Sequence, residues 1–212
     1  MRRGLTAFIL ALLMQALAGC VSVDVGKEPV AQVLLSLRDG TLRPATRRSE
    51  PLIEALLIQP QPANAFADTL SIAYSRREYE FAFYQFASWT ERPVRQLPIL
   101  LQRRLEARGV AGAVGLVGDP LRADWSLGVG IDTLHHDVSV APGSARLAVT
   151  VDLFNRRTRA RVAQRRFEAS APAASADSAA AAQALSLAAA NVFDELLPWL
   201  EAELQRAAAQ VR

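Results

Sequence analysis

The sequence has only one cysteine and two histidines among its 212 residues. A single cysteine excludes a disulfide framework, so packing alone has to stabilise the fold. The two histidines, His135 and His136, are adjacent. Neighbouring residues of a strand point to opposite faces of a sheet, so this pair does not readily share one metal ion. We therefore expect no metal site.

Catalytic motifs are also missing. The chain contains no G-x-S-x-G, no H-E-x-x-H and no glycine-rich phosphate loop. Its acidic residues are dispersed, and spacing alone does not pair any two of them for acid–base chemistry, including Asp132, Asp137 and Asp152. With no catalytic residue to name, we expect a protein that is not an enzyme.

Charge of one sign is not concentrated anywhere in the chain. The formal net charge of +3 falls to +1 if an N-terminal segment carrying Arg2 and Arg3 is removed. The other arginines form small clusters, at 47–48, 103–104 and 156–166, that we interpret as solvated faces. A nucleic-acid-binding protein would show a concentrated basic patch, so we expect no nucleic-acid partner.

The N-terminal apolar run is too short to cross a membrane. Residues 5–17 follow Arg2 and Arg3, whereas a transmembrane helix needs about 18 to 20 apolar residues. A short charged segment followed by such a run is typical of a secretory signal. We therefore predict that residues 1–19 are a signal peptide.

The run ends in the pattern of a bacterial lipoprotein signal. The lipobox consists of Leu17, Ala18, Gly19 and Cys20. We expect cleavage before Cys20, which then carries a covalent diacylglycerol and an N-acyl lipid and leaves no need for another cofactor. At about 0.8 kcal/mol per buried methylene, three acyl chains hold a protein on a membrane essentially permanently. Val21 rather than Asp follows the cysteine, which favours the periplasmic face of the outer membrane over the inner membrane.

The remaining 193 residues suit one domain with a substantial core. Residues 20–30 contain Gly26 and Pro29 among small and polar residues, and we interpret them as a lipidated tether. Residues 31–212 are then a single periplasmic domain. Within it, period-two alternation or short apolar runs predict seven strands, at 31–37, 52–58, 68–74, 79–83, 125–132, 147–153 and 159–169. The Ser75–Arg77 segment is the predicted turn of a hairpin between the third and fourth of them.

Two segments have helical spacing. One begins near Pro93 and ends at Gly109, with Pro98 as an interruption. The other is capped by Asp177 or Ser175 and ends near Arg206. The prolines at 60 and 62 indicate an edge strand or a break. The predicted fold class is α+β: a mostly antiparallel sheet with an inner helix and a long C-terminal helix packed on one face.

Seven of the fourteen aromatic residues lie between Tyr74 and Trp89. Aromatic residues favour strands and supply core area, so we interpret most of them as packing, with a ligand platform as the alternative. If a partner or lipid surface exists, the candidates are Tyr84, Trp89, Arg92 and Arg95. In the other interpretation Trp89 closes the core and both arginines are solvated. Likewise, glycines 128 and 130 leave room either for a ligand or for a packed helix.

The segment EYEFAFYQFASWTERP, residues 78–93, is the most distinctive stretch of the chain. Together with the lipobox, the Leu97–Leu105 helix and the alanine-rich C-terminal helix ending in Trp199 and Leu200, it resembles the ABC-type transport auxiliary lipoprotein family. These are PqiC-like lipoproteins associated with MCE-domain lipid transporters. The resemblance covers most of residues 20–212.

The resemblance implies an accessory, non-enzymatic part of a system that moves phospholipids or other hydrophobic molecules between two membranes. Its partners would be an MCE-domain protein with an ABC permease and an ATPase, beside the membrane that holds the lipid anchor. A homo-oligomer is left open. Two other functions also stay open: a structural lipoprotein of envelope assembly, and a small-ligand or lipid-binding module unconnected to an ABC transporter.

Overall fold

The computed structural model describes residues 31–40, 46–62 and 64–210. The chain divides into two units, residues 1–31 and 32–212, and the description below concerns the second. The predicted signal peptide, the lipobox with Cys20 and the tether at 20–30 lie outside the described residues.

In the described part of the chain there are eight strands and two helices. Their bounds are β1 Val33–Leu35, β2 Ile53–Pro60, β3 Ser71–Arg77, β4 Glu80–Trp89, α2 Pro93–Arg108, β5 Ala111–Leu116, β6 Trp125–Asp137, β7 Ser144–Asn155, β8 Ala160–Pro172 and α3 Ser178–Gln210. The α+β class is confirmed, and so are both predicted helices.

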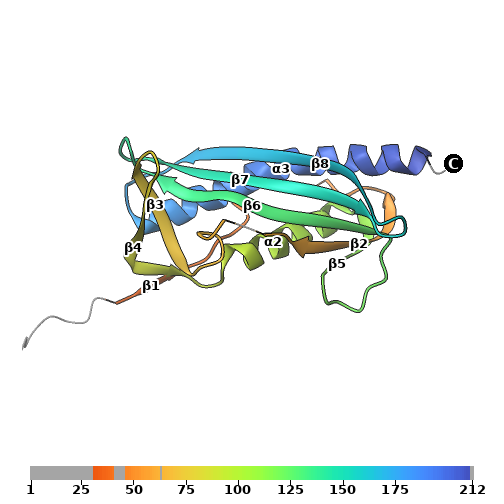
Figure 1. Ribbon diagram of the computed structural model, residues 1–212, viewed down its shortest axis with the longest axis horizontal. Helices are drawn as coiled ribbons and strands as arrows, with labels where there is room; N and C mark the ends of the chain where they lie inside the picture. The colour runs from red at the N-terminus through yellow and green to blue at the C-terminus, as the bar shows by residue number, and fades with distance from the viewer. Residues whose placement is uncertain (1–30, 41–45, 63, 211–212) are drawn as a thin grey trace, which may run out of the picture. The chain divides into compact units, whose positions relative to one another are not determined.

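All eight strands belong to one sheet, in the order β1-β4-β3-β6-β2-β5, with β7 and β8 added beyond β6. The long strand β6 pairs with β2 near its start and with β3 near its end, while β7 runs along its whole length (Figure 1). The β3–β4 hairpin therefore lies at one end of β6, and the turn between β7 and β8 lies at the other.

The sheet is mixed: most of its pairing is antiparallel, as predicted, but it also contains parallel pairs that the sequence did not indicate. The predicted meander β6-β7-β8 and the β3–β4 hairpin are antiparallel, but β1–β4, β2–β5, β2–β6 and β3–β6 are parallel pairs. Period-two alternation shows which face a side chain points to, and it carries no information on the direction of the neighbouring strand. Helix α2 supplies part of the long connection that parallel strands need.

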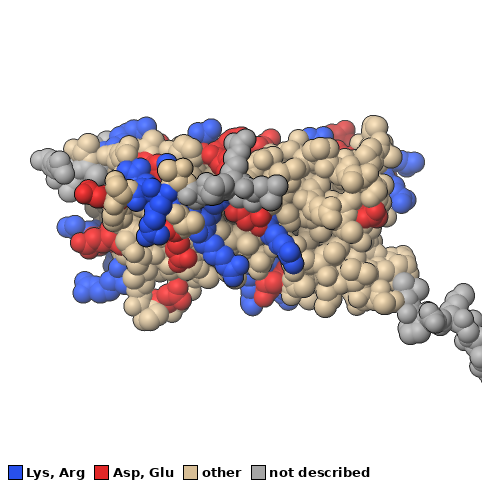
Figure 2. Space-filling view, turned by 180° about the vertical axis from the view of Figure 1, so that it is seen from behind, with Lys and Arg blue, Asp and Glu red and all other residues tan. Residues whose placement is uncertain are grey.

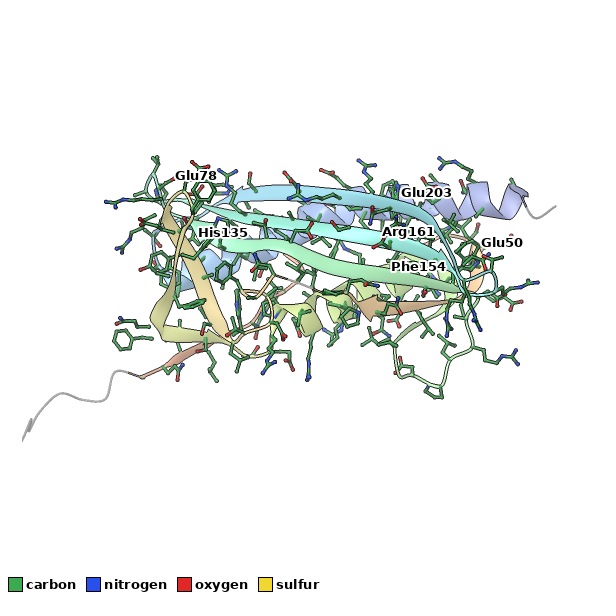
Figure 3. All side chains as sticks on the ribbon, viewed as in Figure 1. Glu50, Glu78, His135, Phe154, Arg161 and Glu203 are labelled. Carbon is green, nitrogen blue, oxygen red and sulfur yellow. The ribbon has the colours of Figure 1, made fainter. Side chains whose placement is uncertain are left out.

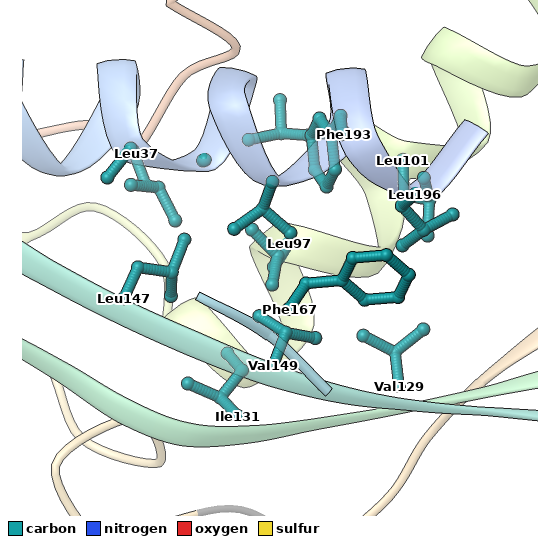
Figure 4. Packing of buried hydrophobic residues seen from close by; sticks show 14 of the residues in the cluster. Leu37, Leu97, Leu101, Val129, Ile131, Leu147, Val149, Phe167, Phe193 and Leu196 are labelled. Atoms are coloured by element: carbon teal, nitrogen blue, oxygen red, sulfur yellow. The ribbon is translucent and has the colours of Figure 1, made fainter. Parts of the chain in front are cut away.

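Both helices cover the same face of the sheet. Helix α3 packs on β7 and β8, and α2 packs on β2 and β5. Figure 4 shows the core between the layers, where Phe167 of β8 meets Phe193 and Leu196 of α3. The amide of Ala180 donates to the Asp177 carboxylate at 2.9 Å, which is the predicted N-terminal cap of α3.

A buried arginine joins the two helices to the loop after β1. The Arg104 guanidinium lies 2.8 Å from the Asp39 carboxylate and 3.2 Å from that of Asp194. Its side chain is only 8% exposed. Because a buried cation needs anionic partners, this contact fixes α2, α3 and the 38–40 segment with respect to one another.

The packing decides two questions that the sequence left open: the role of the prolines at 60 and 62, and what fills the space at glycines 128 and 130. Strand β2 lies between β5 and β6, so its prolines mark a break at Pro60 rather than an edge. The space above Gly128 is filled, since a Cβ there would lie 2.6 Å from the Gln61 side-chain nitrogen. One at Gly130 would lie 3.2 Å from the Pro62 carbonyl oxygen. The two glycines accommodate the 61–62 segment, so the space holds neither a ligand nor the predicted helix.

Candidate functional site

The β3–β4 hairpin exposes aromatic side chains at its tip and along β4. The tip is the two-residue connection Glu78–Tyr79, beyond the predicted turn at Ser75–Arg77, because β3 continues to Arg77 (Figure 3). Four aromatic side chains of this segment, the aromatic tip, are well exposed: Tyr79 at 88%, Phe86 at 55%, and Phe81 and Phe83 at 45% each. Single exposed hydrophobic residues are ordinary, but four exposed aromatic residues within positions 79–86 of one hairpin point to an interaction surface.

On one face of the hairpin the aromatic rings form a small cluster. The Phe66 ring centroid lies 4.6 Å from that of Phe81 and 5.9 Å from that of Phe83. The edge of Phe81 also meets His135 of β6, with centroids 5.1 Å apart. These contacts hold the rings in place while leaving part of their surface open to solvent.

Beside the hairpin, a cavity of about 330 Å³ reaches the beginning of α3. Its lining consists of Tyr74, Arg76, Phe83, Tyr84, Gln85, Phe86, Val138 and Ala176. The Tyr74 and Tyr84 rings pack at 4.8 Å, and the Arg76 guanidinium lies 5.2 Å from the Tyr74 ring centroid. Aromatic walls with one cation are suited to a hydrophobic molecule that carries a negative group.

Tyr84 is held by a buried histidine. Its hydroxyl and the Nδ1 of His136 are 2.8 Å apart, and His136 is fully buried. Burial, aided by the charge of Asp177, raises the pKa of Tyr84 to about 12. Burial also lowers the pKa of His136, against the opposing carbonyl of Pro142 and carboxylates of Asp137 and Asp177. Both groups are therefore neutral at pH 7, which suits the apolar wall that Tyr84 forms.

The four predicted surface residues do not form one site. Tyr84 lines the cavity, but Trp89 is 1% exposed at the end of β4 and belongs to the core, so the packing interpretation replaces the surface one. Arg92 lies outside the cavity lining, with its guanidinium 3.1 Å from the Asp68 carboxylate. Arg95 is exposed on α2 and also lies outside the lining.

The cation of the cavity is Arg76, a residue of the predicted turn that instead belongs to β3. The sequence contains a pattern that indicates this position. Tyr74 and Arg76 are two residues apart, so their side chains share one face if the strand continues through both. Two larger hollows lie elsewhere and have charged linings. One, of about 630 Å³, includes four arginines around the β7–β8 turn: Arg122, Arg156, Arg157 and Arg159.

Within residues 31–40, 46–62 and 64–210, no three histidine, cysteine or acidic side chains are grouped as a metal site would require. Over the same ranges, neither helix has both the length and the apolar character of a membrane span.

The fold is similar to that of two proteins of known crystal structure. Protein XCC0632 from Xanthomonas campestris superposes with a TM-score of 0.72 at 23% identity, over 84% of this chain and 99% of that one. An uncharacterized protein gives a TM-score of 0.62 at 12% identity, over 80% of this chain and 99% of that one. At these identities the likeness concerns the fold alone. No curated protein sequence gives a significant match.

A protein-family model does match, over residues 35–196, and it describes the ABC-type transport auxiliary lipoprotein component. The matched range runs from β1 through most of α3, so it includes the hairpin and the cavity lining. The family is one of auxiliary transport components and not of enzymes. This chain belongs to the ABC-type transport auxiliary lipoprotein family.

Proposed function

We propose that the protein is a non-enzymatic accessory lipoprotein, held at the periplasmic face of the outer membrane by acylated Cys20. In this proposal it serves an MCE/ABC-type system that moves phospholipids or other hydrophobic molecules across the periplasm. The observation that carries the proposal is the family match over residues 35–196. The lipobox at Leu17–Cys20 supports the anchor.

The cavity beside the hairpin supports contact with a hydrophobic molecule. Its walls are aromatic, and Arg76 places one cation at the Tyr74 ring. At about 330 Å³ it is near the lower end of ligand-binding cavities, which span about 300 to 1,000 Å³. A site of this size holds part of an amphiphile. We therefore assign the protein a docking or handover role rather than that of a carrier enclosing its cargo.

The test is affinity purification from gently solubilised envelopes with a C-terminal tag, followed by mass spectrometry of proteins and lipids. The proposal predicts recovery of an MCE-domain protein with its permease and ATPase. Recovery of lipid without any transport protein would favour a lipid-binding module instead. Recovery of neither would favour a structural lipoprotein of envelope assembly.

Arginine variants test whether the cavity binds the transported lipid. Arg76→Ala removes the cation beside Tyr74 and should lower the amount of co-purified anionic lipid several-fold. Arg95→Ala is the matched control, because Arg95 is an exposed arginine outside the cavity lining. An equal lipid yield from Arg76→Ala and Arg95→Ala would remove the cavity from the proposal. Circular dichroism should show that both variants are folded.

A further inference from the structure

The aromatic tip is not explained by packing within the domain. Tyr79 is 88% exposed and has a φ of 65°, in the left-handed region that bulky side chains rarely adopt. Phe86, at 55%, also keeps more than half of its surface open. Such an aromatic residue has a costly backbone conformation, and its side chain makes little contact within the domain. This combination points to a contact outside the domain.

The position of the first strand places the membrane within reach of this tip. Strand β1 pairs in parallel with β4, the second strand of the hairpin, with Val33 opposite Ala87. Twelve residues, 21–32, separate Cys20 from Val33. A fully extended chain of this length spans at most about 45 Å. An acylated Cys20 therefore keeps Val33 within about 45 Å of the bilayer whatever path the intervening residues take.

The end of the sheet at the β7–β8 turn is farther from the hairpin and from β1, where the tether joins the domain. Strand β6 pairs with the hairpin at its last residues, and its first residue, Trp125, pairs with Asn155 beside the β7–β8 turn. Thirteen residues of strand at about 3.3 Å per residue separate these ends by roughly 40 Å. That far turn carries arginines rather than exposed aromatic residues.

Charge distinguishes the two ends as well. Helix α3 carries no charged residue from Ser178 to Phe193, and Figure 2 shows a largely uncharged surface over the hairpin half of the visible face. At the hairpin tip two arginines, Arg76 and Arg77, are balanced by Glu78 and Glu80. A surface with exposed aromatic rings and no net charge suits the headgroup and upper acyl region of a bilayer, where amphipathic rings concentrate.

We propose that the aromatic tip (Tyr79, Phe81, Phe83 and Phe86) inserts into the interfacial region of the membrane in which Cys20 is acylated. The inference rests on the lipid anchor of the proposed function. The acyl chains supply the attachment, and the tip sets the orientation of the domain. A weak contact suffices, because the tether raises the effective concentration of the tip at the bilayer.

The test uses the acylated full-length protein in vesicles. Cys20 is the only cysteine and its thiol is consumed by the lipid, so a cysteine introduced by Tyr79→Cys or Phe86→Cys is the only free thiol. A nitroxide attached there reports its depth through its accessibility to oxygen and to a water-soluble nickel reagent. Thr158→Cys, in the exposed β7–β8 turn, is the matched control.

We expect the oxygen-to-nickel accessibility ratio to be several-fold higher at residues 79 and 86 than at 158. The difference should persist in phosphatidylcholine vesicles without anionic lipid, because the tip has no net charge. Aqueous labels at 79 and 86 on a protein that remains acylated would overturn the inference while leaving the anchor intact. Burial only in phosphatidylglycerol, or only after adding transport proteins, would also overturn it.

Mass spectrometry of the N-terminal peptide separates this failure from failure of the anchor. A peptide that begins at an acylated Cys20 supports the anchor, and Cys20→Ser should release the protein from the membrane fraction. A peptide without acyl groups would refute the anchor and this inference together.

Discussion

Tyr84 and Trp89 lie five residues apart on β4, and both are aromatic, yet only Tyr84 lines a cavity. Trp89 belongs to the buried core, whereas Tyr84 is only partly buried and contacts solvent through the cavity. The sequence marks both as candidates because both are aromatic residues of one segment. Their difference depends on which distant residues pack against each side chain, and no local pattern encodes such long-range packing.

At the scale of single residues, replacing Tyr79 should have opposite effects on the stability of the domain and on its contact with the membrane. A left-handed conformation costs a non-glycine residue about 1 to 2 kcal/mol, and glycine loses about 0.5 to 1 kcal/mol through its unfolded-state entropy. Tyr79→Gly should therefore raise the free energy of unfolding by about 0.5 to 1 kcal/mol, measured by urea denaturation. Tyr79→Phe, which keeps the strained backbone, should leave it nearly unchanged. Destabilisation by Tyr79→Gly would show that the ring stabilises the domain itself.

The buried histidine predicts a pH dependence of stability. Burial lowers the pKa of His136 from 6.5. Burial is also the largest of the effects that lower the pKa of His135. The folded state then binds fewer protons than the unfolded chain, so the free energy of unfolding should fall as the pH drops below 6.5. The pKa values of Asp137 and Asp177 are lowered from 3.8, so their contributions are lost only at more acidic pH.

Thermal unfolding between pH 7.5 and 5 measures this effect. The Tm should decrease toward pH 5, the decrease should be smaller in His136→Gln, and it should nearly vanish when His135→Gln is added. Gln keeps a polar side chain near the Tyr84 hydroxyl, which makes it a conservative replacement. An unchanged slope in the double variant would contradict the assignment to the histidines.

At the scale of elements, the strongest periodic patterns in the sequence correspond to the longest elements. Strands β6 and β7 alternate clearly because one face packs under the helices and the other carries small or polar residues. Helix α3 was expected from its Asp177 cap and its leucine spacing. Strand β5, Ala111–Leu116, was missed, because its six residues include two glycines and show no alternation. Its pairing with β2 depends on tertiary contact rather than propensity.

A substitution of Arg104 tests whether its ion pairs hold α2, α3 and the 38–40 segment together. Arg104→Ala removes the guanidinium that lies 2.8 Å from the Asp39 carboxylate, which is 23% exposed. Breaking a fully buried ion pair costs about 3 to 5 kcal/mol, and since the Asp194 carboxylate is half exposed we expect a loss of about 2 to 4 kcal/mol in the free energy of unfolding. Arg103→Ala, a neighbouring arginine that is less buried, is the control. Equal losses in the two variants would show that the ion pairs do not stabilise the domain.

At the scale of the whole described domain, its two ends differ in chemistry. The hairpin end has exposed aromatic residues and an aromatic cavity, while the β7–β8 end has a hollow lined by four arginines. From the sequence, the aromatic concentration between residues 74 and 89 was evident, but not that Arg76 joins the cavity. The separation of the two ends follows from the pairing of β3 with the last residues of β6, a parallel contact that alternation does not reveal.

The central claim is that this lipoprotein serves a transport system, and photo-crosslinking in living cells tests it most directly. A photoreactive amino acid at Phe86 reports on the hairpin end, and one at Thr158 reports on the β7–β8 end. We predict lipid adducts at 86 and adducts to an MCE-domain protein at one of the two positions, identified by mass spectrometry. Absence of any transport protein from the adducts at both positions, in cells where Cys20 is acylated, would contradict the account.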